Sequence, residues 1–327
     1  MIKWGILGLG TMANNFATAI KETSNAKLLA ISSLDKNKLS NFSKKFNIDN
    51  KYAYNKYEDL LKLNEIDAVY ISTLNNTHLD LIVKSAQNKK HILCEKPFVM
   101  NFNEAQVAFE HIKKESVFFM EAIAYRSHPQ TKEILNIIDN NEIGKINAIE
   151  SSFGFKAKVR PESRHYNKKL GGGAILDLGC YPVSISQLIA SLIPNIDISN
   201  FLLINKKKEI GSTDVDIDAY AELQFDNKFT CVIASSFKEN LGKKTRIIGK
   251  KGEILIENTW HGDPSIIKIK GEKNYEINVK CNENIYSYEI ENISKSVLEN
   301  KKESIYPGMS LIETLLNMKI LDEWLND

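Results

Sequence analysis

The fold of this chain is decided near its start, by the stretch Ile2-Lys3-Trp4-Gly5-Ile6-Leu7-Gly8-Leu9-Gly10-Thr11-Met12-Ala13. A short apolar run is followed at once by the pattern G-x-G-x-x-A, which opens a segment with helical periodicity. In this pattern the first glycine permits a tight turn, the second lets the backbone approach a pyrophosphate, and the alanine allows close packing of helix on strand. Because helix N-termini attract phosphates, we expect a dinucleotide to be held by Gly8, Gly10, Thr11, Met12 and Ala13. A glycine-rich turn that binds no ligand can have the same sequence, so the pattern of the surrounding residues must distinguish the two cases.

The segment up to residue 122 alternates between strand-like and helix-like stretches. We expect strands at 2–7, 27–33, 67–73, 91–94 and 117–120. We expect helices between them, at 11–22, 37–46, 57–63, 78–89 and 103–114. Apolar strands that alternate with helices are typical of a doubly wound parallel sheet. The fold class is therefore predicted to be α/β, with an N-terminal Rossmann dinucleotide-binding domain at residues 1–122.

The pattern changes after this point. Strand-like stretches dominate, at 146–156, 200–206, 217–225, 229–237, 244–248, 253–257, 265–270 and 275–280. Short turns such as Asp226–Lys228 and Lys250–Gly252 join several of them, as in antiparallel hairpins. Helices are expected at 128–140, 177–191, 285–300 and 309–325. We therefore predict that residues 123–327 form a second domain of the α+β type.

Composition excludes several classes of protein. The 327 residues correspond to about two domains of ordinary size. The 43 basic residues barely exceed the 41 acidic ones, so the chain has no basic excess for binding nucleic acid. We see no apolar run near about 18 residues and therefore expect no membrane span. The four cysteines form no CxxC pair and no histidine or carboxylate cluster has metal-ligand spacing, so we expect a soluble cytoplasmic protein without disulfides or metal.

The end of the second expected strand bears on cofactor choice. An acidic residue about 20 positions after the glycine turn would favour NAD by binding the ribose 2′-hydroxyl. Ser33 stands at that place, and together with Lys36 or Lys38 it could receive the 2′-phosphate of NADP. Asp35 could serve NAD instead if the strand ended two residues later. We favour NADP over NAD, although surface lysines are most often merely solvated.

A charged pair and a proline follow another buried strand, in the stretch His91-Ile92-Leu93-Cys94-Glu95-Lys96-Pro97-Phe98. In an open α/β sheet the carboxyl ends of the strands face the ligand crevice. Pro97 restricts the residue before it to an extended conformation, so the backbone at Lys96 is held.

With this Glu-Lys-Pro motif the chain resembles the Gfo/Idh/MocA oxidoreductases. The segment Thr73-Leu74-Asn75-Asn76-Thr77-His78 is similar to the family's Thr-Pro-Asn-x-x-His, with Leu74 in place of the proline. The resemblance implies that the cofactor is contacted by Thr73, Asn75, His78, Glu95 and Lys96, besides Ser33 and Lys38. The position of His78 alone fits a residue at the cofactor and an ordinary residue at a helix N-terminus equally well.

The second half resembles one branch of the family, which contains dihydrodiol and D-xylose dehydrogenases. The stretch Leu170–Pro182 reads LGGGAILDLGCYP, and its Asp177-x-Gly179-x-Tyr181 is similar to the branch pattern. Supporting stretches are Phe119–Ala122, Arg126, His128–Pro129, Gly144–Ile146 and Phe153–Phe155. The branch commonly has Arg where this chain has Leu34. The resemblance implies a large open, mainly antiparallel sheet in the second domain and a homodimer or higher homo-oligomer formed through it.

A dehydrogenase must move a hydride and a proton, and Tyr181 is our candidate proton carrier. A cation about 4 Å away, at an effective dielectric of about 20, contributes about 4 kcal/mol, or about 3 pKa units. Lys96, which the resemblance pairs with Tyr181, could thus bring the phenol pKa from about 10 to near neutrality. Asp177 lies one helical turn before Tyr181 and would bind a substrate hydroxyl or orient Lys96.

Each of these residues also has an ordinary interpretation. Tyr181 could be a core tyrosine, Lys96 a strand-end surface lysine and Asp177 a first-turn acid favoured by the helix dipole. Arg126, Arg160 and Arg164 are expected to line the substrate pocket, or to lie on the surface. The residues His91, His111 and His261 have no motif around them, and we interpret them as structural.

The function predicted from these residues is NAD(P)-dependent oxidation or reduction of a small sugar-like molecule, namely a sugar, a polyol or a cyclic diol. Two alternatives remain. The first is a glycosidase that uses NAD for transient oxidation. The second is a non-enzymatic sensor of dinucleotides on the same fold, which the joint presence of Lys96, Asp177 and Tyr181 disfavours.

Overall fold

The computed structural model describes residues 1–281 and 284–326. The chain divides into two compact units. Unit 1 comprises Met1–Ser127 and Glu283–Leu315, and unit 2 comprises His128–Asn282 and Leu316–Asp327. Each unit is described by itself below.

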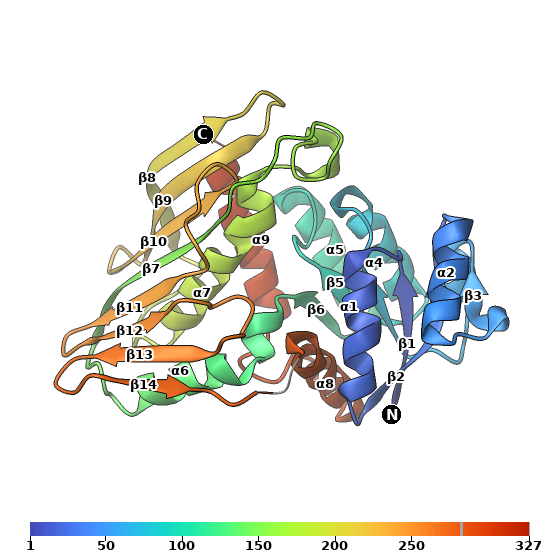
Figure 1. The fold of residues 1–327 in the computed structure, drawn as a ribbon, viewed down its shortest axis with the longest axis horizontal. Coiled ribbons are helices and arrows are strands. Elements are labelled where there is room, and N and C mark those ends of the chain that lie inside the picture. The colour runs from blue at the N-terminus through green and yellow to red at the C-terminus, as the bar shows by residue number, and fades with distance from the viewer. Residues whose placement is uncertain (282–283, 327) are drawn as a thin grey trace. The chain divides into compact units, whose positions relative to one another are not determined.

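Unit 1 is built on a parallel sheet of six strands in the order β3-β2-β1-β4-β5-β6 (Figure 1). This is the strand order of a Rossmann fold, so the expected N-terminal fold is confirmed. The strands are β1 (Ile2–Leu7), β2 (Ala26–Ser32), β3 (Ala53–Tyr54), β4 (Ala68–Ile71), β5 (His91–Glu95) and β6 (Phe119–Ala122). The helices between them are α1 (Thr11–Ala19), α2 (Lys36–Phe46), α3 (Tyr57–Leu61), α4 (His78–Gln87) and α5 (Phe102–Glu115).

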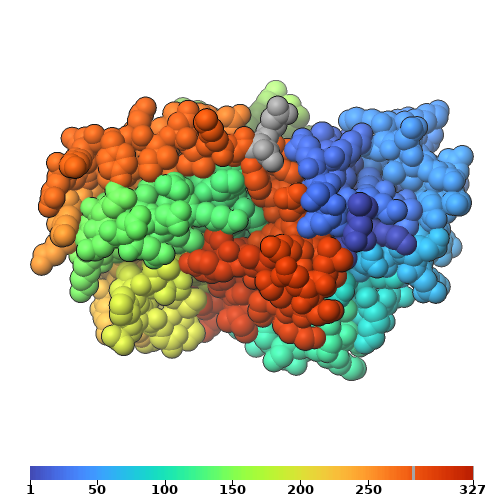
Figure 2. Space-filling view, turned by 90° about the horizontal axis from the view of Figure 1, so that it is seen from below, coloured from blue at the N-terminus to red at the C-terminus, as the bar shows by residue number. Residues whose placement is uncertain are grey.

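A helix from the far end of the chain completes unit 1. Helix α8 (Ile285–Leu298) packs against α1, β1 and β2, and Figure 2 shows this segment beside the start of the chain. Ile290 and Ile293 on α8 are fully buried, and the indole nitrogen of Trp4 donates to Ser294 Oγ over 3.1 Å. The division of the chain into two units therefore differs from the single boundary at residue 122 that we expect from the sequence. The apolar face of α8 is buried against the Rossmann sheet and its first helix.

Unit 2 is built on a sheet of eight strands in the order β14-β13-β12-β11-β7-β10-β9-β8. Its strands are antiparallel except for the parallel pair β7 and β10, which confirms the mainly antiparallel sheet. The strands are β7 (Ile146–Gly154), β8 (Phe201–Ile210), β9 (Asp216–Phe225), β10 (Phe229–Ser236), β11 (Thr245–Gly249), β12 (Glu253–Ile256), β13 (Ile266–Lys270) and β14 (Tyr275–Asn278).

Helices cover one face of this sheet. Helix α7 (Cys180–Ser191) packs on β7 and β10, and α6 (Pro129–Asp139) packs on β13, beside which it lies in Figure 2. In β9 the side chains alternate, with Ala221, Leu223 and Phe225 buried under the helices. The last helix, α9 (Leu311–Leu325), begins in unit 1 and ends in unit 2. Alternate burial is what a sheet with one covered face requires.

Among the described residues, one helical stretch, Lys168–Ser191, is long and apolar enough to cross a membrane by length and composition. Its most apolar window is 94% buried inside the protein. It contains α7, which packs on the sheet of unit 2, and such burial is expected of a core helix.

Candidate functional site

The glycine turn of unit 1 has the geometry of a phosphate cradle. Gly8 follows β1 with φ +90°, and a Cβ there would lie 2.7 Å from Thr73 Cγ2 and 2.9 Å from Ser72 O, so the position requires glycine. A Cβ on Gly10 would meet nothing within 4 Å. The first turn of α1 carries no acidic residue and Gly10 supplies no side-chain cap. The amide groups at this helix start have no side-chain cap, and their binding of a pyrophosphate stays a prediction.

The carboxylate that follows β2, that of Asp35, accepts hydrogen bonds from backbone amides. Strand β2 ends at Ser32, and the buried Ser33 follows it, its hydroxyl accepting from Asp35 N over 3.2 Å. Asp35 is the N-cap of α2 and accepts from the backbone amides of Asn37 (2.9 Å) and Lys38 (3.1 Å). The acid considered for binding the NAD ribose thus satisfies the start of its own helix. The side chain of Lys38 is exposed to solvent on α2.

The loops after β4 and β5 meet through a histidine. His78, at the start of α4, is fully buried, and its Nδ1 lies 3.1 Å from the carbonyl oxygen of Pro97. Burial lowers the pKa of His78, so the ring is neutral near neutral pH and its Nδ1–H donates to that carbonyl. In this position His78 supports the loop after Lys96. Of the two other family positions on the β4 side, Thr73 is half-buried and Asn75 is buried.

Glu95 and Lys96 stand at the carboxyl end of β5, as predicted. The hydroxyl of the buried Tyr70 donates to the Glu95 carboxylate. Lys96 is half-buried, and its peptide bond to Pro97 is cis. The charged pair thus lies at the sheet edge where the strand ends of an open α/β sheet face their ligand.

In unit 2 the Asp177–Tyr181 stretch begins within a π-helical turn. Residues Ile175–Gly179 form this turn, and α7 follows directly from Cys180. Such turns are frequent at functional sites. Asp177 is buried, Arg164 Nη1 donates to its Oδ1 over 2.7 Å, and His165 Nε2 lies 3.6 Å from its Oδ2. The structure therefore brings Arg164 and Asp177 together, two residues expected at the substrate.

Tyr181 lies among aromatic rings. Its ring centroid is 5.3 Å from that of Phe153, at an edge-to-face angle, and 5.5 Å from that of Trp260. Phe153 comes from β7 and Trp260 from the loop after β12. His261, next along that loop, packs edge-on to Phe153 at 6.0 Å and is exposed to solvent. Tyr181 is itself only half-buried.

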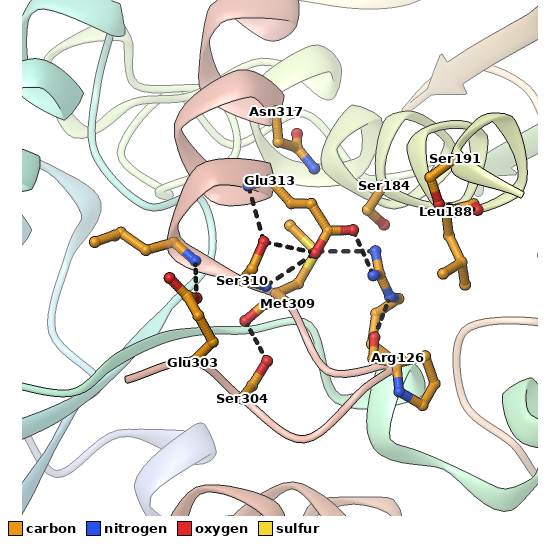
Figure 3. Close-up of polar contacts among 12 residues, drawn as sticks. Arg126, Ser184, Leu188, Ser191, Glu303, Ser304, Met309, Ser310, Glu313 and Asn317 are labelled. Atoms are coloured by element: carbon orange, nitrogen blue, oxygen red, sulfur yellow. Dashed lines mark hydrogen bonds and ion pairs between the residues drawn. The ribbon is translucent and has the colours of Figure 1, made fainter. Parts of the chain in front are cut away.

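Arg126 lies in a buried ion pair inside unit 1 (Figure 3). The side chain is 1% exposed, and its Nη2 donates to Glu313 Oε1 over 2.6 Å. Its Nε donates to the carbonyl oxygen of Pro307 over 2.6 Å, and Nη1 lies 3.1 Å from Met309 Sδ. Glu313 also accepts from the amide and hydroxyl of Ser310. We expected Arg126 to bind the substrate. In the structure its guanidinium instead binds Glu313 and the carbonyl oxygen of Pro307, which is a structural role.

Two family models match this chain. Residues 2–123 match the model of an oxidoreductase family with an NAD-binding Rossmann fold, and residues 131–255 match the GFO/IDH/MocA C-terminal domain. The chain belongs to the Gfo/Idh/MocA family. It is therefore an NAD(P)-dependent oxidoreductase, and the predicted family is confirmed.

Three proteins illustrate how much of the chain is shared with known proteins. The chain is 32% identical to the trans-1,2-dihydrobenzene-1,2-diol dehydrogenase of Xenopus tropicalis, covering 98% of this chain and 96% of the relative. It is 27% identical to D-xylose 1-dehydrogenase (NADP(+)) 2 of Haloferax volcanii, covering 80% and 78%. The crystal structure of an aldose-aldose oxidoreductase from Caulobacter crescentus, complexed with glycerol, has a TM-score of 0.89 at 19% identity, covering 99% of this chain and 96% of that one. This last likeness concerns the fold.

Two residues around the family motifs were not found by sequence reasoning. His165 beside Asp177 and Trp260 beside Tyr181 come from loops without a recognisable motif, and His261, which the sequence analysis interprets as structural, packs edge-on to Phe153. The only available signal was the adjacency of Arg164 to His165 and of Trp260 to His261. In the part of the chain that the structure describes, no group of three or more His, Cys, Asp or Glu could hold a metal ion.

Proposed function

We propose that this protein transfers a hydride between a nicotinamide cofactor and a hydroxyl or carbonyl carbon of a sugar, a polyol or a cyclic diol, with Tyr181 as acid/base assisted by Lys96. The observation that carries the proposal is the Asp177–Tyr181 turn. It supplies a carboxylate held by Arg164 and, one turn later, a half-buried phenol set among aromatic rings. A phenol bordered by rings and an adjacent carboxylate suits a polyhydroxyl substrate.

The residues that would hold the cofactor lie in unit 1. Gly8, Gly10 and the start of α1 fit its pyrophosphate. Ser33 and Lys38 are proposed at the 2′-phosphate of NADP, because the carboxylate of Asp35 is engaged as a helix cap. The NADP dependence in the name of the Haloferax volcanii relative supports this choice over NAD. When bound, the cofactor supplies the hydride acceptor or donor, which no side chain can provide.

The chain's own residues then have three tasks. Tyr181 takes the proton from the substrate hydroxyl, or returns it, at its phenolic oxygen. Lys96, as the family resemblance implies, assists by favouring the phenolate form of Tyr181. Asp177, held by Arg164, accepts a hydrogen bond from a neighbouring substrate hydroxyl. The near-zero net charge of the chain agrees with a neutral substrate.

The substrate class rests on the names of the relatives, which point to a cyclic diol and to D-xylose. We also propose a cytoplasmic homodimer or higher homo-oligomer that associates through the outer face of the sheet in unit 2. That face carries half-exposed apolar side chains, including Val232 on β10, Ile248 on β11 and Leu255 on β12. Half-exposed apolar side chains on a sheet face can contribute to an interface, although here they alternate with the ion-paired Glu150, Arg246 and Glu253.

A panel of sugars, polyols and cyclic diols tested with NADP and NAD examines the proposal. We expect net formation of the reduced cofactor with at least one substrate, and a higher kcat/KM with NADP. Hydrolysis of glycosides without net reduction would favour the NAD-dependent glycosidase instead. Cofactor binding without turnover of any substrate would favour the dinucleotide sensor.

A further inference from the structure

The peptide group that follows Lys96 and Pro97 is held by two side chains. His78 on α4 donates to the carbonyl oxygen of Pro97 over 3.1 Å. Glu121 on β6 accepts a hydrogen bond from the amide of Phe98 through Oε1 over 2.9 Å. Because proline has no N–H, the Phe98 amide is the first backbone donor after Lys96. The two contacts therefore hold both polar groups of the single Pro97–Phe98 peptide, one residue after Lys96.

A carboxylate at position 121 needs an explanation, because every residue of β6 is buried. Glu121 is 2% exposed and lies opposite Cys94 in the register between β5 and β6. An apolar side chain would pack there at no cost in desolvation, whereas a buried carboxylate is costly unless it is hydrogen-bonded. The bond from Phe98 is the interaction that an apolar residue could not make.

Charged and titratable groups face Glu121 from several elements. Burial raises the pKa of Glu121 to about 7, while the Phe98 amide, the Thr314 hydroxyl and Lys96 lower it and Glu95 raises it. Glu289 faces the same cluster from α8, and its pKa is raised well above the ordinary value by burial and by Glu95 and Glu121. The thiol of Cys94, on β5, has a raised pKa through burial and the same carboxylates. Glu121, with a pKa of about 7, thus titrates near neutrality, and Glu289 belongs to the same buried cluster.

We propose that Glu121 is a positioning residue for Lys96, whose ionised carboxylate fixes the Lys96–Phe98 backbone and whose protonation loosens that hold. A hydrogen bond to an ionised acceptor is about twice as strong as one between neutral groups. As pH falls through neutrality the carboxylate takes up a proton, the bond from Phe98 weakens, and Lys96 is held less firmly. The inference rests on the proposed function, because it is through Lys96 that the change reaches turnover.

The test is the pH profile of kcat for the full-length Glu121→Gln variant. The glutamine has the same size and its amide oxygen accepts the same bond, but it cannot ionise. We expect a kcat equal to that of the wild type at about pH 6, and about three- to tenfold lower at about pH 8.5, with KM nearly unchanged. Glu289→Gln is the matched control, because it replaces another buried carboxyl of the same cluster by a group of the same size. We expect it to retain the wild-type profile.

Two results would overturn the proposal. One is a constant ratio of wild-type to Glu121→Gln kcat across this range, because a merely structural role shifts the whole profile. The other is an infrared difference spectrum in which wild type and Glu121→Gln show the same carboxyl protonation between about pH 8 and pH 6. The infrared titration needs no turnover. If the wild type turns over none of the tested substrates, the proposed function fails, while the infrared result still decides whether Glu121 titrates.

Discussion

Replacing Arg126 by methionine tests whether this residue is structural or binds substrate. In the structure its guanidinium pairs with Glu313 at 2.6 Å, with 1% and 16% of the two side chains exposed. Arg126→Met keeps much of the side-chain length but leaves the Glu313 carboxylate without its cation. Removing one partner of a buried pair costs about 3–5 kcal/mol. Because Glu313 retains some solvent access, we expect about 3 kcal/mol.

Urea unfolding followed by tryptophan fluorescence measures this loss. With an m-value of about 2–3 kcal/mol/M, the midpoint should fall by about 1–1.5 M. Replacing both partners, as Arg126→Met with Glu313→Met, should recover most of it, because an apolar pair of similar volume is often as stable as a buried ion pair. Arg246→Met is the matched control. Arg246 pairs with Glu253 while 42% exposed, so we expect less than about 1 kcal/mol.

The same comparison has a pH dependence of known sign. The pKa of Glu313 is lowered in the folded protein, because Arg126 and the Ser310 donors outweigh its burial. A lowered carboxyl pKa contributes stability above its unfolded value and loses it as pH falls through the folded value. The difference in unfolding free energy between wild type and Arg126→Met should therefore shrink in acid. If Arg126→Met were as stable as the wild type and had a raised KM, the structural role of Arg126 would be refuted and a role in substrate binding supported.

Three further predictions follow from the geometry. Gly173→Ala should destabilise the protein, because the new Cβ would lie 2.2 Å from Asp216 Oδ1. The loss should exceed about 1–3 kcal/mol, which is the cost of the backbone angle φ +122° alone. An unfolding midpoint equal to that of the wild type would contradict this. Burial raises the pKa of Asp216 to about 6, so the unfolding free energy of the wild type should fall as pH rises from about 4 to about 6. Urea titrations of Asp216→Asn should lack this dependence of stability on pH. A dependence that persists in the variant would exclude Asp216 as its source. Ser33→Asp should lower the NADP-to-NAD ratio of kcat/KM by about tenfold or more, because a carboxylate repels the 2′-phosphate; an unchanged ratio would place the phosphate elsewhere.

The fold of unit 1 could be predicted largely from local sequence, because its strands are apolar runs and its helices have clear periodicity. Strand β3, only Ala53–Tyr54, is too short to leave such a signal. The assignment of α8 to this unit could not be predicted either. An amphipathic helix shows that it has an apolar face, but which surface covers that face depends on the tertiary fold.

The candidate site shows the same limit. The glycine turn, the Glu95–Lys96 pair and the Asp177–Tyr181 turn are local motifs, and each was recognisable as a short stretch. The ion pair of Arg126 with Glu313 joins residues far apart in the chain, and so does the packing of Trp260 on Tyr181. Nothing in the flanking residues of these four predicts such contacts. Arg126 was accordingly assigned to the substrate, whereas its contacts in the structure are to the segment before α9 and to the first turn of that helix.

The central claim is that Tyr181 carries the proton, and Tyr181→Phe tests it most directly. The variant keeps the ring that packs against Phe153 and Trp260 and removes only the hydroxyl. With the best substrate of the panel and saturating NADP, we predict that kcat falls by about 100-fold or more while the Kd for NADP stays unchanged. A kcat within about threefold of the wild type would contradict the assignment of Tyr181 as the acid/base.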